Sequence, residues 1–500
     1  MSDNAYQLLA LCVYLIAMLL IGYWAYRRTT NLGDYMLGGR DLGPAVSALS
    51  AGASDMSGWL LLGLPGAIYA SGLVEGWIAV GLTIGAWLNW KFVAPRLRTY
   101  TQVSNNSITV PSFLENRLKD RSRLLRVASG LIILLFFTFY VSSGMVAGGL
   151  FFESSFGTGY HTGMILVSAV VVAYTLFGGF LAVSYTDFVQ GTIMLLALVL
   201  VPLVGIFMTG GLGETADSIR AVNPDGLSMI TGTSVLAVIS AAAWGLGYFG
   251  QPHIIVRFMA LRSPHEAARA RRIGIGWMLI SLIGAVCTAL VGIAYFQQNP
   301  DQTLDDPEAV FIALGQIIFH PLIAGIMLAA VLAAVMSTIS SQLLVTSSAL
   351  VEDLYKAVFK SNATDRQLVM LGRLAVLAVS VVSAVLAWER NDTILELVAY
   401  AWAGFGASFG PAILLSLYWR KLTAMGALAG MVAGAATVVV WGNVESLTSN
   451  MYEIVPGFLL SLLVTVGVSI LTYKPNPDIE TEFDESIRLL ERQELEEELT

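Results

Sequence analysis

Charged side chains are scarce in this sequence. Asp, Glu, Lys and Arg make up 12% of the 500 residues, about half the share of a soluble globular protein. Apolar residues make up 56%, and the mean hydropathy is +0.72. One soluble core cannot hide so large an apolar surplus, so lipid must be the solvent for much of the surface. The composition therefore predicts an integral membrane protein.

Residues that usually carry chemistry are also few. Cys12 and Cys287, the two cysteines, both fall inside apolar runs, which fits packed thiols rather than a disulfide framework. The four histidines show no spacing suited to a metal. The sequence has no phosphate-binding loop and no basic, aromatic face for nucleic acid. These absences argue against an enzyme and against a nucleic-acid-binding protein.

The apolar runs are long enough to be membrane spans. The N-terminus lacks the basic region and cleavage site of a signal peptide, so the first run is expected to remain as a helix. Taking about 20 apolar residues as one crossing predicts an all-α protein with thirteen spans. The ninth run is too long for a straight crossing and is expected to include an irregular or interfacial piece. The approximate limits are 5–26, 44–70, 74–95, 124–152, 159–182, 187–210, 233–258, 272–297, 311–350, 368–388, 394–418, 424–442 and 453–473.

The basic residues predict the orientation of these spans. With the N-terminus outside, all of the 27 Lys and Arg residues except Arg220 and Arg390 fall in cytoplasmic segments, including a group from Arg257 to Arg272. Positive charge gathers on the cytoplasmic side of membrane proteins, so the N-terminus is expected outside and the C-terminus inside. The tail after Lys474 is acidic and is expected to be a cytoplasmic helix or a disordered end.

Two spans carry helix-breaking residues near their middle. Residues 50–59 read SAGASDMSGW, and residues 244–252 read WGLGYFGQP. Glycine weakens a helix, and proline removes a donor and clashes with the preceding turn. Secondary carriers are often built from inverted repeats with interrupted helices at mid-membrane. Because the two breaks are five spans apart, spans 2–6 and 7–11 are expected to form two five-helix repeats of opposite orientation.

The predicted spans and repeats divide the chain into five parts. They are an N-terminal helix with a cytoplasmic link (1–43), the first repeat (44–210), the second repeat (211–421), two C-terminal helices (422–474) and the acidic tail (475–500).

Two acids stand out inside the spans. Asp55 is the only acid within span 2, and an ionisable side chain at that depth is costly and usually marks an ion path. The alternative is a carboxylate that caps backbone donors at the break. Asp187, near the start of span 6, is either functional or an interfacial acid at a helix start.

Several uncharged residues have both a functional and a structural interpretation. Ser337 and Thr338 could supply oxygens to a small hard cation, together with carbonyls freed at the break, or could join helices. Ser57 could act at the site or bond back to its own helix. Trp244 and Tyr248 are spaced i, i+4 and would share one helix face. These two residues and Tyr140 could either touch a substrate or serve as packing. Arg40 is most simply a positive-inside residue.

At these motifs the chain resembles the sodium/solute symporter family. The matching stretches are LGGRDLGP (37–44), ALSAGASDMSGWLL (48–61), GLGYFGQPH (245–253), LAAVMST (332–338) and YAWAGFG (400–406). The resemblance runs from about residue 5 to 470. It implies a LeuT-type core of ten helices, spans 2–11, in a bacterial cytoplasmic membrane. It also implies sodium-coupled uptake of L-proline, with sodium as the coupling ion and a monomer sufficient for transport.

The resemblance also implies roles for particular residues. The sodium ligands would be the carbonyls of Ala53, Met56 and Ala334 with the hydroxyls of Ser337 and Thr338. Asp55 would support sodium binding, Asp187 would serve sodium entry or release, and Arg40 would act in gating or coupling. The proline pocket would be lined by Ser57, Gly63, Tyr140, Trp244, Tyr248 and Pro252.

Other functions stay open at this point. The same machine could carry another small solute. A membrane sensor would need an output domain, and the roughly 26 residues after Lys474 are too few for one. An ion channel would need a pore-lining ring or filter loop, which the sequence does not contain.

Overall fold

The computed structural model describes residues 2–28, 32–356, 364–390 and 392–498. All regular elements in these residues are helices, apart from one isolated β-bridge between Leu42 and Leu261. In lipid a helix is favoured because it satisfies every backbone donor and acceptor within its own segment. The all-α membrane fold is thus confirmed.

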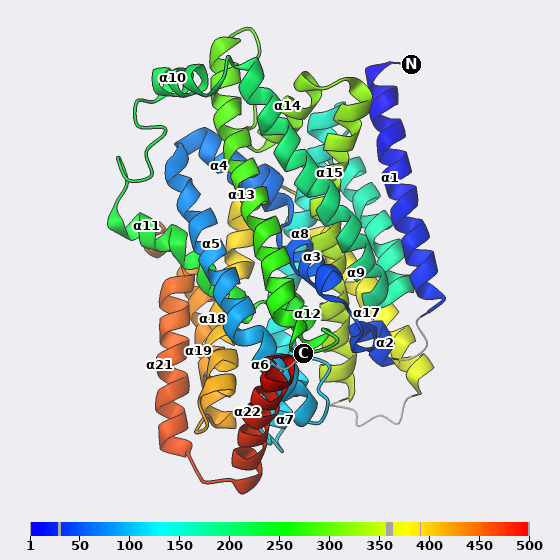
Figure 1. The fold of residues 1–500 in the computed structure, drawn as a ribbon, viewed down its shortest axis with the longest axis vertical. Coiled ribbons are helices and arrows are strands. Elements are labelled where there is room, and N and C mark those ends of the chain that lie inside the picture. Colours follow the sequence, from blue (N-terminus) through cyan, green and yellow to red (C-terminus); the bar gives the residue numbers. More distant parts are fainter. Residues whose placement is uncertain (1, 29–31, 357–363, 391, 499–500) are drawn as a thin grey trace.

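Long helices form the bundle (Figure 1). They are α1 (Asp3–Tyr26), α5 (Gly76–Leu88) continued through η4 (Asn89–Val93) into α6 (Ala94–Val103), α8 (Leu124–Phe156), α9 (Tyr160–Met208), α13 (Glu266–Gln298), α15 (Pro321–Ser348) continued by η7 (Ala349–Tyr355), α17 (Asp365–Leu386), α18 (Ile394–Tyr418), α19 (Ala424–Gly442) and α21 (Ile454–Thr472).

Shorter helices form the broken spans and the two ends of the bundle. The first broken span has α3 (Pro44–Asp55), η2 (Trp59–Gly63) and α4 (Leu64–Ser71), and the second has α11 (Val235–Ala242), η5 (Ala243–Gly250) and α12 (Pro252–Met259). The remaining elements are α2 (Leu32–Leu37), η1 (Gly38–Arg40), η3 (Leu73–Glu75), α7 (Val110–Leu118), α10 (Leu212–Val222), η6 (Pro307–Ala309), α14 (Val310–Ile318), α20 (Glu445–Thr448) and α22 (Pro477–Glu498).

The number of spans is only partly settled. Among the described residues, 10 helices are long and apolar enough to cross a membrane, and they coincide with ten of the predicted spans. The other three predicted spans hold shorter apolar helices, at Trp59–Ser71, Tyr160–Leu176 and Val235–Gly250. Thirteen therefore stays a prediction. The ninth predicted span was expected to include an irregular or interfacial piece, and the structure divides it into α14 and α15.

The boundary between predicted spans 5 and 6 was wrong. The label α9 covers two helices that meet at a kink, where Gly179 has the non-helical angles φ 58° and ψ −153°. A Cβ at Gly179 would lie 2.6 Å from Tyr35 Cδ2, and the left-handed φ favours glycine. The bend therefore falls at Gly179 rather than at 183–186, and Asp187 lies inside a helix.

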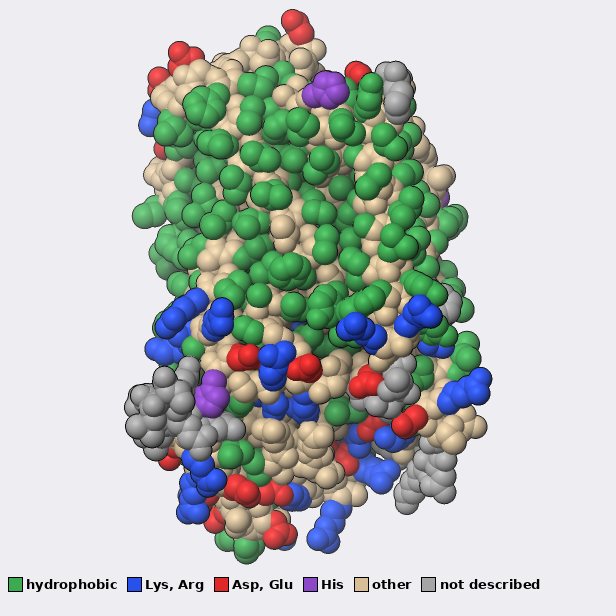
Figure 2. Space-filling model, turned by 45° about the vertical axis from the view of Figure 1, so that its right-hand side comes forward, with side chains coloured by type: hydrophobic (Ala, Val, Ile, Leu, Met, Phe, Trp, Pro, Cys, Tyr) green, Lys and Arg blue, Asp and Glu red, His purple; other side chains and the backbone are tan. Residues whose placement is uncertain are grey.

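The outer surface matches a lipid environment. Figure 2 shows a broad band of hydrophobic side chains, with most of the visible Lys and Arg gathered beneath it at one end. Figure 1 places α2, α7 and α22 at that end and α10 and α14 at the other. Inside the bundle, 83% of the most apolar 18-residue stretch of α15 and its continuation η7 is buried. This is a larger share than in any other long helix of the described chain. The helix that carries Ser337 and Thr338 is therefore the centre of the core.

Both predicted helix breaks are confirmed. Helix α3 ends at Asp55, and Met56 has φ −75° and ψ 74°, outside the helical region. In the second span, the 3₁₀ segment η5 ends at Gly250, the backbone of Gln251 is extended, and Pro252 begins α12. A Cβ at Gly247 would lie 1.9 Å from the indole nitrogen of Trp402. Glycine there lets α18 pack directly against the broken segment.

The acidic tail forms a docked helix. Helix α22 packs against α6 and α7, where the ring of Phe483 lies 6.2 Å from that of Tyr100 and 5.2 Å from the Arg117 guanidinium. Ion pairs join Lys119 to Glu482 and Arg420 to Asp484. Of the two expectations for the tail, the helix is confirmed.

Candidate functional site

Oxygen atoms from two helices meet where α3 ends. The hydroxyl of Ser337 on α15 donates to the carbonyl of Ala53 at 2.6 Å and lies 3.1 Å from the carbonyl of Ala334. The Thr338 hydroxyl lies 3.5 Å from the same Ala53 carbonyl. All four residues are buried. The structure thus brings together four of the five predicted sodium ligands.

Met56, the fifth predicted ligand, lies at the break itself. Its N–H donates to the carbonyl of Gly52, closing the last turn of α3. Its ψ of 74° turns its own carbonyl away from the helix direction. A cluster of neutral carbonyl and hydroxyl oxygens suits a hard cation, because each oxygen can present a lone pair to the ion.

The Asp55 carboxylate faces the second break. Its Oδ2 accepts a hydrogen bond from the hydroxyl of Tyr248 on η5, and its Oδ1 has no hydrogen-bond partner among the described residues. Among the described residues, no backbone N–H donates to this carboxylate, so the capping interpretation of Asp55 gains no support. Asp55 thus joins the break in α3 to the break before α12.

Ser57 and Tyr140 lie beside this pair. The Ser57 hydroxyl accepts a long bond of 3.4 Å from the N–H of Trp59, so it partly caps the start of its own helix. Tyr140 on α8 is buried nearby, and its hydroxyl has no hydrogen-bond partner among the described residues. Of the predicted pocket residues, Tyr248 thus contacts the Asp55 carboxylate directly, and Ser57 lies two residues further along the chain.

An aromatic cluster adjoins these residues. The ring of Trp244 stacks on Tyr452 at 5.3 Å and on Trp402 at 6.3 Å, and Trp59 lies 6.4 Å away. Tyr248 meets the same Trp402 edge-on at 5.1 Å. Since η5 is a 3₁₀ helix, residues four apart do not share a face as they do in an α-helix. Trp402 joins Trp244 to Tyr248 instead.

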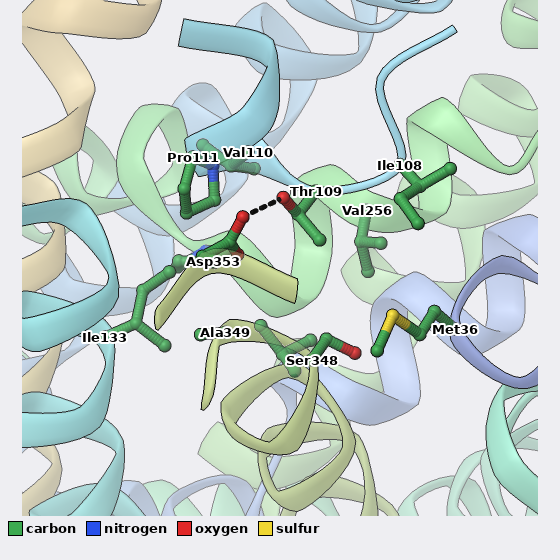
Figure 3. A pocket seen from close by; sticks show the side chains of 12 residues that line it. Met36, Ile108, Thr109, Val110, Pro111, Ile133, Val256, Ser348, Ala349 and Asp353 are labelled. Atoms are coloured by element: carbon green, nitrogen blue, oxygen red, sulfur yellow. Dashed lines mark hydrogen bonds between the residues drawn. The ribbon is translucent and has the colours of Figure 1, made fainter. Parts of the chain in front are cut away.

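Gly63 and Pro252 have other surroundings. A Cβ at Gly63 would lie 3.3 Å from Leu395 Cβ of α18, so this glycine allows close packing. Pro252 lines a small cavity of about 20 Å³. Figure 3 shows Thr109, Val256 and Asp353 around this cavity, with a hydrogen bond from Thr109 to Asp353. In the described part of the chain, the neighbours found for Gly63 and Pro252 do not include Trp244, Trp402 or Tyr452.

Asp187 belongs to a buried ion pair. Its Oδ2 lies 3.1 Å from Arg257 Nη2 and accepts from the Ser50 hydroxyl at 2.7 Å. Arg257 also donates to the Ser341 hydroxyl at 2.6 Å. Both charged side chains have 0% exposure. A charge in such a low-dielectric interior needs a partner, and each of the two side chains supplies one to the other. Asp187 is therefore not an acid at a helix start, because it lies inside α9 and pairs with Arg257 in the protein interior.

Arg40 does more than add positive charge to one face. It donates to the Met259 carbonyl at 2.9 Å, the Ser107 carbonyl at 2.5 Å and the Thr101 hydroxyl at 3.2 Å. Burial lowers the pKa of Arg40 to about 10, and the nearby Arg98 adds to the shift. The guanidinium still carries its charge at neutral pH, so it holds three segments together at one end of the bundle.

Residues 35–434 match the model of the sodium:solute symporter family. The chain belongs to this family. Curated relatives agree over nearly their full length. The high-affinity proline transporter PutP of Bacillus subtilis is 64% identical over 94% of this chain and 98% of its own. The osmoregulated proline transporter OpuE of the same organism is 55% identical over 94% and 95%, and a sodium/proline symporter of Staphylococcus aureus is 51% identical over 95% and 94%.

Solved structures agree on the fold of this symporter-family chain. A Na⁺-coupled sialic acid symporter, in a substrate-bound outward-open state, superposes with a TM-score of 0.80 at 21% identity, over 94% of this chain and 98% of its own. A nucleobase-cation-symport-1 family transporter gives 0.55 at 15% identity, over 91% and 99%. These likenesses confirm the expected LeuT-type symporter fold.

Three residues around the site were missed by sequence reasoning. Trp402 lies in the stretch 400–406 that carried part of the family resemblance, but it received no role. Arg257 is a charge within an apolar run from Ile254 to Met259, a signal that could have been recognised. Tyr452 precedes the last span and has no local signal, since only packing brings it to Trp244.

Proposed function

We propose that this protein is a secondary active transporter that couples sodium entry to the uptake of L-proline by alternating access, without covalent chemistry. Curated relatives with proline transport in their names align over almost the whole chain. The observation that carries the proposal is the meeting of the Ser337 hydroxyl and the Ala53 carbonyl at the break in α3.

In this proposal sodium, as a co-transported substrate, binds where those oxygens meet. The ligands are the carbonyls of Ala53, Met56 and Ala334 and the hydroxyls of Ser337 and Thr338. The Ser337–Ala53 hydrogen bond supports this, because it puts an α15 hydroxyl within bonding distance of an α3 carbonyl. Sodium would then bind both helices at once, and the two helices would have to stay together for the ion to remain.

Proline is proposed to bind on the other side of Asp55. At neutral pH it is a zwitterion with a small apolar ring. Aromatic faces such as that of Trp244 favour the cationic amine, and the start of η2 after Ser57 offers a helix N-terminus to the carboxylate. The remaining members of the proposed pocket are Gly63, Tyr140, Tyr248 and Pro252.

Asp55 is proposed to couple the two substrates. It lies two residues after Ala53 in the chain, and its carboxylate bonds to Tyr248. Sodium that orders the end of α3 therefore also orders a wall of the proline pocket. Thermodynamic linkage makes the effect mutual, so bound proline strengthens sodium binding by the same factor.

Gating roles are proposed for two charged residues, Asp187 and Arg40. Asp187 serves sodium entry or release, since it lies in contact with Ser50 of α3 and Arg257 of α12. Arg40 acts in gating or coupling, since it ties η1 to α6, α12 and the chain at Ser107.

The topology completes the proposal. The protein lies in a bacterial cytoplasmic membrane with its N-terminus outside and its C-terminus inside, and a monomer suffices for transport. The gathering of Lys and Arg at the end that holds α22 supports this orientation. Residues 44–210 and 211–421 are proposed as the inverted repeats, flanked by residues 1–43, 422–474 and the tail 475–500.

The test uses purified protein in sealed lipid vesicles. Labelled proline should accumulate when sodium is imposed outside and should not accumulate when potassium replaces it. Absence of saturable, sodium-dependent proline uptake would refute the proposal. Competition by other amino acids in the same vesicles decides whether another small solute is the preferred substrate.

A further inference from the structure

Tyr452 contacts the proposed pocket from outside the ten-helix core. It lies just before α21, in the C-terminal helix pair formed by α19 and α21, which has no role in the transport scheme above. Its ring stacks on Trp244 with centroids 5.3 Å apart and planes 28° apart. Tyr452 therefore adjoins Trp244, one of the proposed proline-binding residues.

Polar bonds hold the Tyr452 ring in this position. Its hydroxyl donates to the carbonyl of Ala399 on α18 at 2.7 Å, and its N–H donates to the hydroxyl of Ser240 on α11 at 3.1 Å. Each bond ties Tyr452 to a different helix of the core. The ring cannot swing away from Trp244 without breaking the bond to Ala399.

The segment under Trp244 is held from the same side. The indole N–H of Trp402 donates to the Trp244 carbonyl at 2.7 Å. A Cβ at Gly406 of α18 would lie 2.8 Å from both Gly247 Cα and Ile454 Cδ1 of α21. Backbone and side chain of Trp244 are thus fixed by α18 and α21 together, although η5 lacks the regular bonding of an α-helix.

We propose that Tyr452 is a positioning residue for substrate recognition, which sets the place of the Trp244 ring and thereby the size of the solute ring that the pocket accepts. The inference rests on the proposed function and deepens it. It gives the C-terminal helix pair a part in specificity. Because Tyr452 acts through Trp244, its loss should affect proline recognition and leave the oxygens around Ser337 unchanged.

The experiment measures sodium-driven proline uptake by the full-length protein in lipid vesicles, with cyclic imino acids of four-, five- and six-membered rings as competitors. Tyr452→Ala should raise the proline KM about tenfold, as expected for a lost aromatic stack and its hydrogen bond, and change the maximal rate less than about twofold. The six-membered competitor should gain against proline, because the truncated side chain leaves room. Half-saturating sodium at saturating proline should stay as in the unmodified protein.

Matched variants separate positioning from general damage. Tyr452→Phe keeps the stack but loses the bond to Ala399, so its KM should rise less than that of Tyr452→Ala. Tyr452→Leu keeps apolar volume without the stack and should show about the same tenfold rise in KM, and it serves as the test if Tyr452→Ala does not fold. Tyr473→Ala, at the other end of α21, should leave proline KM and competitor ranking unchanged. In a Trp244→Ala background, Tyr452→Leu should add little, since the two residues act as one unit.

Two results would overturn the inference. A lower maximal rate in Tyr452→Leu, with proline KM and competitor ranking unchanged, would make Tyr452 a structural residue only. Additive effects of Tyr452→Leu and Trp244→Ala would show that Tyr452 does not act through Trp244. Failure of the proposed function is seen separately, because the unmodified protein would then show no sodium-dependent proline uptake, and the inference would fall with it.

Discussion

The hydroxyl of Ser337 donates a 2.6 Å hydrogen bond to the carbonyl oxygen of Ala53, a residue 284 positions away in the chain. This bond joins the most buried long helix of the described bundle to the end of a broken one. In an ordinary helix the Ala53 carbonyl would be bonded within its own segment. Because α3 ends two residues later, the carbonyl is available to α15, and an ion can compete for it.

Ser337→Ala should weaken sodium binding selectively. The loss of one oxygen ligand to the sodium ion costs about 1.5 kcal/mol, so the half-saturating sodium concentration for proline uptake should rise about tenfold. Proline KM at saturating sodium should change little. The control is Ser347→Ala on the same helix, whose hydroxyl bonds only to Leu344 among the described residues. Equal effects of the two variants would count against the proposed sodium site.

Asp55→Asn should abolish most transport. The amide removes the negative charge that faces the Tyr248 hydroxyl, and the two breaks would lose their charged link. Tyr248→Phe keeps the carboxylate and should raise proline KM more than it raises half-saturating sodium. Uptake in vesicles at varied sodium measures both quantities. Near-normal sodium dependence in Asp55→Asn would contradict the coupling role of this residue.

Arg257→Met should destabilise the protein strongly. It leaves Asp187 as a buried charge without its guanidinium partner, and breaking such a pair typically costs about 3–5 kcal/mol. The double variant Asp187→Leu/Arg257→Met removes both charges and should recover much of that loss. Thermal unfolding of the purified proteins in detergent compares the three. A double variant no more stable than Arg257→Met would show that the ion pair is not the reason for the loss.

Phe483→Ala should release the tail helix from the bundle. The ring packs against Tyr100 and lies near the Arg117 guanidinium. It is 7% exposed, more deeply buried than Ile487, the partly buried apolar residue one turn further along the same helix. The two ion pairs that remain are partly exposed, and such pairs contribute about 0–1 kcal/mol and weaken with salt. Limited proteolysis of the purified protein should therefore cut the tail faster.

Glu485→Ala is the control for the tail, because Glu485 is an exposed residue of the same helix. It should be cut at the rate of the unmodified protein. Equal cutting rates for Phe483→Ala and the unmodified protein would show that the Phe483 contact does not hold the tail in place.

Local pattern predicted the membrane fold and both helix breaks. Apolar runs indicate spans wherever the chain lies, and glycine and proline disrupt a helix in nearly any context. The same reasoning failed at Gly179, because the bend depends on Tyr35 packing against that glycine. It also left Ser337 open between ion binding and helix packing, since the choice depends on which carbonyl lies opposite.

The sequence by itself determined that this protein is a many-helix membrane protein with two interrupted spans, because hydrophobicity and helix breaking act over a few residues. Only the tertiary structure decided which side chains meet at the breaks. Asp55 with Tyr248, Asp187 with Arg257 and Trp244 with Tyr452 are paired across distant parts of the chain. Such pairs depend on how each helix is rotated and packed against its neighbours, and no local pattern carries that information.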